Sequence, residues 1–435
     1  MQKTDNWSEQ ISFYRFFSNE RVKEEDLIKT MQEHCKAQCL GKRHLLLIED
    51  TTELNMEKHR QRIHSKDMLG LAGNNADLGF FCHSTLVVDP ADASLTGLID
   101  THLWHRQADK KDKNERDYKR IPFEDKESWR WAERAIASRR QLQEVETITV
   151  VQDREGDIYE SFCRLGSSHV NFVVRSAQDR LTPEGKLRDV INAFPVLGQY
   201  CMTITGDNKK RKKRAAVLDV HYGTVELNRP KNLPGENAKE YPPTLSVQVV
   251  YVKENADNLP DGEEPVEWIL YTSHPVNNLD DAREILYWYT LRWLIEDLHR
   301  TLKSEGVNYE ASELESGKAL RKLLIVALMA AVQILQLRQA RNGNTYQKPS
   351  LVFSNEQLDC MEDLLTRFEG KTEKTKNPYS RNNLAWAAWI IARPGGWKGY
   401  SSQRPPGVII FREGWIRFQN IFEGWSIAKK NVYKR

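Results

Sequence analysis

The sequence predicts a mixed α/β fold, and three of its features support that prediction. Two short apolar runs each end in an aspartate, two strand-like segments follow the first of these runs, and helical periodicity fills much of the second half. The chain has 435 residues, enough for about two to four domains with large apolar cores. Hydrophobic residues make up 40% of it and charged residues 29%. This balance is typical of folded globular chains and excludes an intrinsically disordered protein.

Nothing in the sequence indicates secretion or a membrane. The first residues, MQKTDNWSEQ, lack the basic start and apolar stretch of a secretory signal. No uninterrupted apolar run reaches the roughly 18 residues of a membrane span, and the longest candidate, Leu323 to Val332, is expected to be a core helix. A cytoplasmic location is therefore expected. The six scattered cysteines are expected to be buried thiols, because they show neither zinc-ligand pairs nor a disulfide framework.

The order of the predicted elements defines the fold more closely. Residues 1–40 are expected to be a helical lead-in, since Glu24 to Leu40 contains few strand formers and no proline. A meander of three strands follows, and then a helix, a strand, a short helix and another strand. The predicted strands are 44–50, 80–89, 95–104, 147–153 and 170–176, and the first helix among them is Lys126–Gln143. Strands one and four thus end in Asp50 and Asp153. This order is typical of the RNase H-like fold of the retroviral integrase superfamily.

The second half of the chain adds two features to this core. From about 178 to 273 the pattern changes to short alternating strands broken by Pro, Gly and Asn, which predicts an inserted β-subdomain. Helical periodicity resumes at Asp280 and continues to about Arg338. The RNase H-like domain is therefore predicted to span 41–338, and 339–435 is predicted to be a C-terminal α-helical region.

The distribution of charge gives a first indication of a partner. The net charge of +3 says little by itself, but Lys209 to Arg214 is an unbroken run of six basic residues within the predicted insertion. Such a run can follow a phosphate backbone and release its counterions. It is also typical of a solvated loop tip, so it favours contact with nucleic acid without establishing it.

The segment YTLRWLIEDLHRTLK gathers polar side chains at helical spacing. They are Tyr289, Arg292, Glu296, Arg300 and Lys303. On one continuous helix they would fall within an arc of roughly 80°, so that one face carries a carboxylate among groups able to hold phosphate. The opposite face is apolar and is expected to pack against the sheet. A surface helix with ion pairs along it is the alternative that this spacing leaves open.

Three motifs in this order resemble the signatures of the bacterial cut-and-paste transposases of the IS-four family. They are HLLLIEDTTEL, VVQDREGD and the spacing Y-x2-R-x3-E-x6-K that begins at Tyr289. The resemblance runs from about residue 10 to the C-terminus and includes GGWKGYSSQRPPG. It implies a DNA transposase of the bacterial cytoplasm and nucleoid. Such an enzyme nicks DNA, forms and opens a hairpin and transfers strands at one metal-dependent site.

The resemblance also implies roles for individual residues. Asp50, Asp153 and Glu296 match the three catalytic acids, which would hold two Mg²⁺ (or Mn²⁺) ions because these hard cations prefer carboxylate oxygens. The residues that match DNA contacts are Tyr289, Arg292, Lys303, Arg300, Arg175 and Trp268. Trp268 among them matches a tryptophan that stacks on a flipped base. Apart from the resemblance, a strand tryptophan is commonly a core residue and Arg175 could be an ordinary surface arginine.

Four neighbours of these residues have less certain roles. Glu49 and Asp157 flank the two aspartates and are expected to orient ligands or cap backbone groups. His299 is expected to be a polar or packing residue, because Mg²⁺ rarely takes imidazole. Trp293 is either a core residue or a DNA contact, and the sequence does not decide between them.

The chain departs from the family pattern at its N-terminus, where only 49 residues precede Asp50. The family's N-terminal DNA-binding domain is therefore expected to be missing. Two functions remain: a transposase acting on double-stranded DNA, both transposon ends and target, or a truncated, non-cleaving inhibitor that dimerises with full-length transposase. A structure-selective RNase H-like nuclease is a weaker third, since it leaves the Tyr, Arg, Glu and Lys pattern unexplained.

Dimerisation, as a homodimer or as a heterodimer with full-length transposase, is expected through 339–435. Large apolar side chains there are expected to exceed what a small terminal region can bury by itself. They are Trp386, Trp389, Ile390, Trp415, Phe418 and Phe422.

Overall fold

The computed structural model describes residues 7–107, 121–204, 213–231, 233, 237–400 and 403–432. The chain divides into two units. Unit 1 comprises Met1–Lys42, Thr51–Asp109 and Leu294–Arg435, and unit 2 comprises Arg43–Asp50 and Lys110–Trp293. The units differ from the predicted domains: a break falls after Lys42, close to the predicted boundary at residue 40, but residue 338 lies inside the unit 1 segment Leu294–Arg435. The reason is that packing between segments distant in sequence defines a unit, whereas the predicted boundaries followed changes of local pattern.

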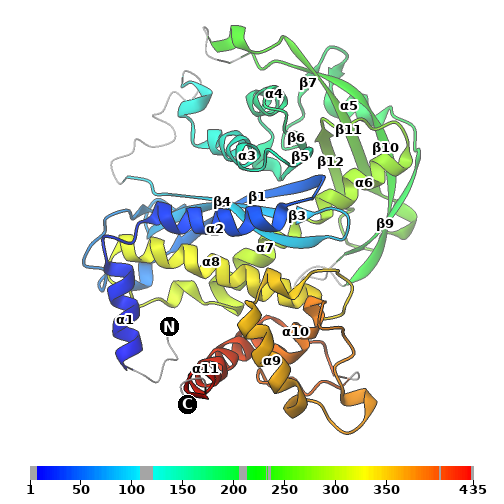
Figure 1. The fold of residues 1–435 in the computed structure, drawn as a ribbon. Helices are drawn as coiled ribbons and strands as arrows, with labels where there is room; N and C mark the ends of the chain where they lie inside the picture. Colours follow the sequence, from blue (N-terminus) through cyan, green and yellow to red (C-terminus); the bar gives the residue numbers. More distant parts are fainter. Residues whose placement is uncertain are drawn as a thin grey trace. The chain divides into compact units, whose positions relative to one another are not determined.

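Unit 1 combines the N-terminal helices, the strand meander and the C-terminal third of the chain. Its helices are α1 (Trp7–Ser18), α2 (Glu24–Cys39), most of α7 (Trp293–Arg300), α8 (Gly317–Ala340), α9 (Asn355–Phe368), α10 (Leu384–Ala392) and α11 (Val408–Val432). Its strands are the second half of β1 (His44–Asn55), β2 (Gly70–Leu71), β3 (Leu78–Asp89) and β4 (Ser94–Trp104). β3 pairs antiparallel with β2 and β4 and neighbours β1, which confirms the predicted meander. α2 and α8 pack on β4 and on each other (Figure 1).

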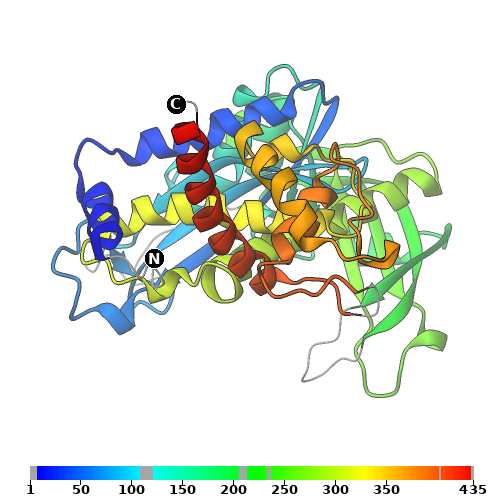
Figure 2. The same cartoon turned by 60° about the horizontal axis from the view of Figure 1, so that its bottom comes forward.

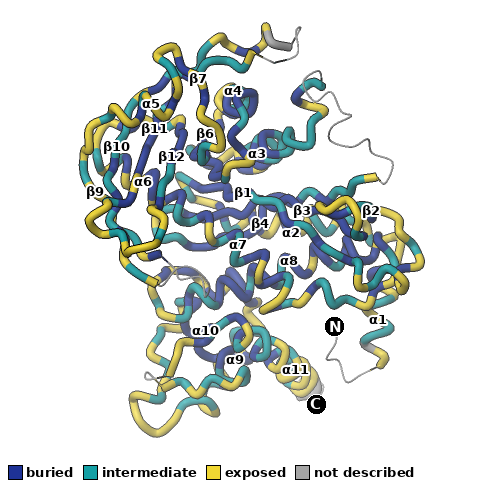
Figure 3. Tube along the Cα trace, turned by 180° about the vertical axis from the view of Figure 1, so that it is seen from behind, coloured by how far each residue is buried: buried dark blue, intermediate teal, exposed yellow. Residues whose placement is uncertain are grey.

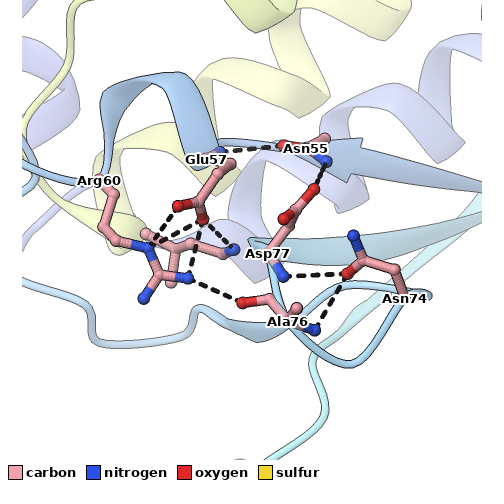
Figure 4. Close-up of polar contacts among 7 residues, drawn as sticks. Asn55, Glu57, Arg60, Asn74, Ala76 and Asp77 are labelled. Atoms are coloured by element: carbon pink, nitrogen blue, oxygen red, sulfur yellow. Dashed lines mark hydrogen bonds and ion pairs between the residues drawn. The ribbon is translucent and has the colours of Figure 1, made fainter.

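A polar network fixes the end of β1 to the turn that precedes β3 (Figure 4). The Glu57 carboxylate accepts hydrogen bonds from the Arg60 Nε (2.8 Å) and from the Leu78 backbone N–H (2.8 Å). The Asn55 side-chain amide donates to Asp77 at 2.8 Å. The hydrogen bond from Arg60 also lowers the pKa of the Glu57 carboxyl below its ordinary value. These bonds hold the start of β3 against the end of β1 and so help to set the register between the two strands.

Helix α8 is the core helix of unit 1. Among the described residues it is the one helix long and apolar enough to cross a membrane, but 72% of its most apolar stretch is buried inside the protein. Its polar side chains reach backbone carbonyls: Lys322 donates to Asn19 (2.9 Å), and Gln336 donates to Leu95 (3.1 Å) and Thr96 (3.1 Å). Buried polar groups that are hydrogen-bonded in this way cost little. The prediction of a core helix over Leu323 to Val332 is therefore confirmed.

The C-terminal aromatic residues are largely covered within unit 1. α10 is buried along its whole length, and α11 packs on α8 and α10 (Figure 2 and Figure 3). Four of the six residues expected at a dimer interface are at most 4% exposed: Trp386, Trp389, Ile390 and Phe418. Trp415 stacks against Phe353. The terminal region does not bury these side chains by itself, because α8, which precedes it, packs on α10 and α11 and contributes surface. They are therefore no evidence for a dimer.

Unit 2 is built on a mixed sheet with helices packed against it. Its strands are the first half of β1, β5 (Thr147–Gln152), β6 (Asn171–Arg175), β7 (Leu181–Thr182), β8 (Gly185–Lys186), β9 (Gly198–Ile204), β10 (Arg214–Asn228), β11 (Thr244–Glu254) and β12 (Glu267–Thr272). Its helices are α3 (Arg130–Gln141), α4 (Tyr159–Ser167), α5 (Leu187–Asn192) and α6 (Leu279–Thr290). The strands predicted over 147–153 and 170–176 are confirmed as β5 and β6. The helix predicted from Lys126 begins at Arg130, after two short 3-10 turns.

The segment 178–273 does not form a β-subdomain of its own. β1, β5 and β6 run parallel, and β12 pairs antiparallel with β6. β11, β10 and β9 follow β12 in antiparallel order, so these strands extend the sheet that carries the two aspartates. An unpaired edge of β6 would leave a row of backbone groups without partners, and β12 supplies them. The alternating pattern of the insertion indicated strands but not the strand to which they join.

The segment 178–273 also contains the basic run and one of the six cysteines. Lys209 to Lys212 of the basic run lie outside the described residues. Arg214 begins β10 and forms ion pairs with Glu254 and Glu263, the latter at 2.9 Å, so it serves the fold. Cys201 is exposed on β9, which differs from the expectation of buried thiols, because β9 lies at the edge of the sheet.

Two histidines meet at the ends of β1 and β5 opposite the aspartates. His44 Nε2 lies 2.9 Å and His274 Nε2 lies 2.7 Å from the Thr149 hydroxyl oxygen. The Trp288 ring packs edge-on against both imidazoles. Burial, and to a smaller extent the nearby His44, lower the pKa of His274 from its ordinary 6.5 to about 4.

This buried histidine predicts a loss of stability in acid. Between pH 6.5 and about 4 the unfolded chain binds a proton at His274 and the folded chain does not, so stability falls as the pH is lowered. The shift corresponds to about 3 kcal/mol over that interval. His274→Gln should flatten urea-unfolding free energies measured between pH 7 and pH 4 by a comparable amount, whereas the exposed His34→Gln should not. Equal slopes for wild type and His274→Gln would contradict the prediction.

Candidate active site

Asp50 lies within β1, and Asp153 directly follows the neighbouring parallel strand β5. The strand predicted over 44–50 therefore does not end at Asp50 but continues to Asn55, because its second half pairs within unit 1. β1 and β5 pair in register up to Ile48 and Val151, so each aspartate lies two residues beyond the same pair. Both aspartates therefore lie at the point where the parallel pairing of β1 with β5 ends, which brings them to the same level of the sheet. The strand residues before them are buried and anchor the backbone. The aspartate side chains themselves are 26% and 34% exposed, which leaves both carboxylates accessible to a ligand.

One cation lies against both aspartates. Arg292 Nη1 is 3.8 Å from Asp50 Oδ2, and Arg292 Nη2 is 3.7 Å from Asp153 Oδ2. Both distances exceed those of a hydrogen bond, so in these two contacts the guanidinium balances the charge of the pair without forming a bidentate bond. The Arg292 side chain is 11% exposed. Little solvent therefore screens it.

Tyr289 orients one of the two carboxylates. Its hydroxyl donates a hydrogen bond to Asp153 Oδ1 at 3.1 Å. Burial and then the charge of Asp153 raise the pKa of Tyr289 to about 12, while Arg175 and Arg292 offset part of that rise. The phenol therefore remains protonated at neutral pH and serves Asp153 as a donor.

Strands β6 and β12 bring Trp268 and Arg175 to Tyr289. The Trp268 and Tyr289 rings meet edge to face, with 5.1 Å between centroids and 70° between planes. Arg175 is paired in register with Leu270 and donates to the Glu267 carbonyl at 3.3 Å. Trp268 is half-buried, unlike a core tryptophan, so part of its surface stays open beside Tyr289.

Glu49 and Asp157 stabilise the fold around the aspartates. Glu49 is fully buried and accepts a hydrogen bond from the Gln152 amide at 2.8 Å. Asp157 is buried, forms an ion pair with Arg180 at 2.6 Å and accepts the Ala177 backbone N–H at 2.7 Å. Sequence reasoning assigned both acids supporting roles but missed Gln152 and Arg180. The one available signal was a glutamine at the end of an otherwise apolar strand, TITVVQ.

The segment that carries the third motif is not one continuous helix. α6 ends at Thr290, and the backbone N–H of Arg292 donates to the Tyr289 carbonyl at 3.1 Å, an i→i+3 bond that forms a turn. α7 then begins at Trp293, and a π-helical turn, Thr301–Glu305, follows it. The predicted arc of roughly 80° therefore does not apply. Tyr289 and Arg292 belong to unit 2 with the two aspartates, and Glu296 belongs to unit 1.

The residues of α7 differ in their surroundings. Glu296 is half-buried, on a helix whose apolar side is buried as predicted. Arg300 pairs with Asp297 on its own helix and lies 3.7 Å from Glu305, which is the ion-pair arrangement that the spacing left open. Trp293 is 56% exposed, and this excludes a core role.

Two of the three predicted metal ligands, Asp50 and Asp153, lie in unit 2. Among the described residues, no three His, Cys, Asp or Glu side chains lie close enough together to hold a metal ion. Asp50 and Asp153 supply carboxylate oxygens, the ligands that Mg²⁺ prefers. Both already face one cation, Arg292. The pair therefore fits two of the three ligands predicted for the site.

Comparison with known proteins gives limited information. No known protein-family profile matches the sequence. The chain is similar to a solved chain described as a piggyBac transposase synaptic complex with hairpin DNA, with a TM-score of 0.28 and 9% sequence identity. The match covers 77% of this chain and 60% of that chain, less than two thirds of its length. A similarity at this TM-score supports no inference about function.

Proposed function

We propose that this chain is a DNA transposase of the IS-four family, similar to Tn-five transposase, which cleaves and joins DNA strands with two Mg²⁺ or Mn²⁺ ions. The observation that carries the proposal is the pair of carboxylates, Asp50 and Asp153, which lie just beyond the parallel-paired part of β1 and β5 and face a single cation. Glu296 is the proposed third ligand, on the strength of its motif. The RNase H-like arrangement is the fold that this order of strands and acids supports.

The residues of the site would have different roles in phosphoryl transfer. Asp50, Asp153 and Glu296 would hold the metal ions, which would supply Lewis-acid activation of the attacking oxygen and neutralise charge on the leaving oxygen. Tyr289 keeps the Asp153 carboxylate oriented, because its hydroxyl donates a hydrogen bond to Oδ1.

Cationic side chains around the acids would hold the DNA backbone. Arg175, Arg292 and Lys303 would each donate to phosphate oxygens. Arg300 should bind phosphate more weakly than the motif implies, because Asp297 and Glu305 already neutralise its charge.

The proposal is tested on DNA that carries the repeats flanking the coding sequence. Incubation of the purified chain with Mg²⁺ or Mn²⁺ should yield a nick at the end of the repeat and then a hairpin, resolved on a denaturing gel. The chelator EDTA should abolish both products. Cleavage that persists in EDTA, or the absence of metal-dependent cleavage on such ends, would contradict the proposed function.

Trp268 predicts a separable effect on the second step. Trp268→Ala should leave the first nick unchanged and slow hairpin formation, since an aromatic platform contributes about 1 to 3 kcal/mol to holding a flipped base. That range corresponds to roughly a ten- to a hundredfold lower rate. The ratio of hairpin to nicked product measures the effect, and Trp7→Ala, at a tryptophan that is 76% exposed, is the matched control. An unchanged ratio in folded Trp268→Ala would rule out base capture.

A further inference from the structure

The position of Arg292 raises a problem for metal binding. Its two terminal nitrogens lie 3.8 and 3.7 Å from oxygens of Asp50 and Asp153. A divalent ion held by both carboxylates would lie within a few ångströms of the same guanidinium. Like charges at such a distance repel strongly where solvent is limited, and the Arg292 side chain is mostly buried.

In the metal-free protein, the guanidinium stabilises the pair of carboxylates. Carboxylates on neighbouring strands repel each other, and a cation that contacts both offsets that repulsion. Arg292 therefore performs, in the metal-free site, the charge compensation that a metal ion would perform in the loaded site. The two cations are alternatives.

We propose that Arg292 is an exchangeable counter-ion: it holds Asp50 and Asp153 in the metal-free protein, and a divalent cation displaces it. The released guanidinium then becomes available to a phosphodiester, so that metal binding and the grip on DNA are coupled through one side chain. This inference rests on the proposed function, because it takes the two aspartates to be metal ligands.

The local structure favours such an exchange. Arg292 lies at the turn between α6 and α7, where an i→i+3 bond replaces regular helical bonding. The two ion pairs at 3.8 and 3.7 Å are each longer than a hydrogen bond. Asp153 keeps the hydrogen bond from Tyr289 when Arg292 leaves, and its orientation does not depend on the arginine.

The test is the binding of Mn²⁺ alone to the whole chain, measured by calorimetric titration, together with thermal unfolding. Arg292→Gln should bind Mn²⁺ at least tenfold more tightly than wild type, a change of about 1.4 kcal/mol. Without metal it should melt at a lower temperature than wild type, and saturating Mn²⁺ should close that gap. Arg188→Gln removes the same charge from a pair with Glu267 and should change neither measurement. Arg292→Lys, whose single ammonium cannot span both acids, should lie between wild type and Arg292→Gln and provides the test if the glutamine variant fails to fold.

Two further variants separate this inference from the proposed function. Asp50→Asn and Asp153→Asn should each weaken Mn²⁺ binding. If they do, and the Arg292 variants bind Mn²⁺ no more tightly than wild type, the exchange is overturned and the metal site stands. If neither asparagine variant alters Mn²⁺ binding, the aspartates are not metal ligands, and both the exchange and the proposed function fail.

Discussion

Replacing Asp50 or Asp153 by asparagine, or Glu296 by glutamine, should reduce metal-dependent DNA cleavage by about a thousandfold or more. Metal-ion catalysis supplies several kcal/mol of transition-state stabilisation, and losing a ligand of the pair forfeits most of it. The substitutions keep side-chain size, and the two aspartates are partly exposed, so the fold should survive. The rate of nicking of DNA that carries the flanking repeats, in Mg²⁺ and in Mn²⁺, measures the effect.

A matched control for this series is Glu155→Gln. Glu155 lies two residues after Asp153, is 67% exposed on its side chain and pairs only loosely with Arg130 at 3.8 Å. The variant removes the same charge from the same loop and should cleave like wild type. Cleavage at the wild-type rate by Asp50→Asn, Asp153→Asn or Glu296→Gln would remove that residue from the catalytic set.

Asp157→Ala should lower the free energy of unfolding by about 3 to 5 kcal/mol, the largest loss of stability expected among these substitutions. The carboxylate is fully buried and compensates the buried Arg180, so its removal leaves an unpaired charge in the interior. It also leaves the backbone N–H groups of Ala177 and Gln178 without an acceptor. Urea unfolding followed by circular dichroism gives the free energy directly.

The size of that loss distinguishes a buried ion pair from a surface one. Asp157→Asn retains a carbonyl oxygen that can accept the two N–H groups, so it should lose less than the alanine variant. Asp280→Ala, at a side chain that is 90% exposed and paired with Arg283, should change stability by less than about 1 kcal/mol. A similarly small loss for Asp157→Ala would show that Arg180 does not depend on Asp157.

Local sequence patterns were sufficient to locate the strands that carry the two aspartates. The apolar runs before Asp50 and Asp153 form strands as expected, and β5 ends before Asp153, but β1 continues past Asp50 to Asn55. The same patterns located α8 and the apolar side of α7, because burial of one helix face follows from its own periodicity. Each of these features depends on residues close together in the chain.

Tertiary structure decided the features that depend on distant partners. Periodicity extended a single helix through Tyr289 and Arg292, but a turn interrupts it and turns Arg292 towards two carboxylates more than a hundred residues earlier in the chain. The sequence patterns predicted an inserted β-subdomain, but β12 pairs with β6 and joins those strands to the main sheet. They also predicted an exposed aromatic interface near the C-terminus, but α8 packs on α10 and α11 and covers most of these side chains. The physical reason is common to these cases: an unpaired strand edge, a buried charge or an apolar face takes the partner that the folded chain places beside it, and no local pattern specifies that partner.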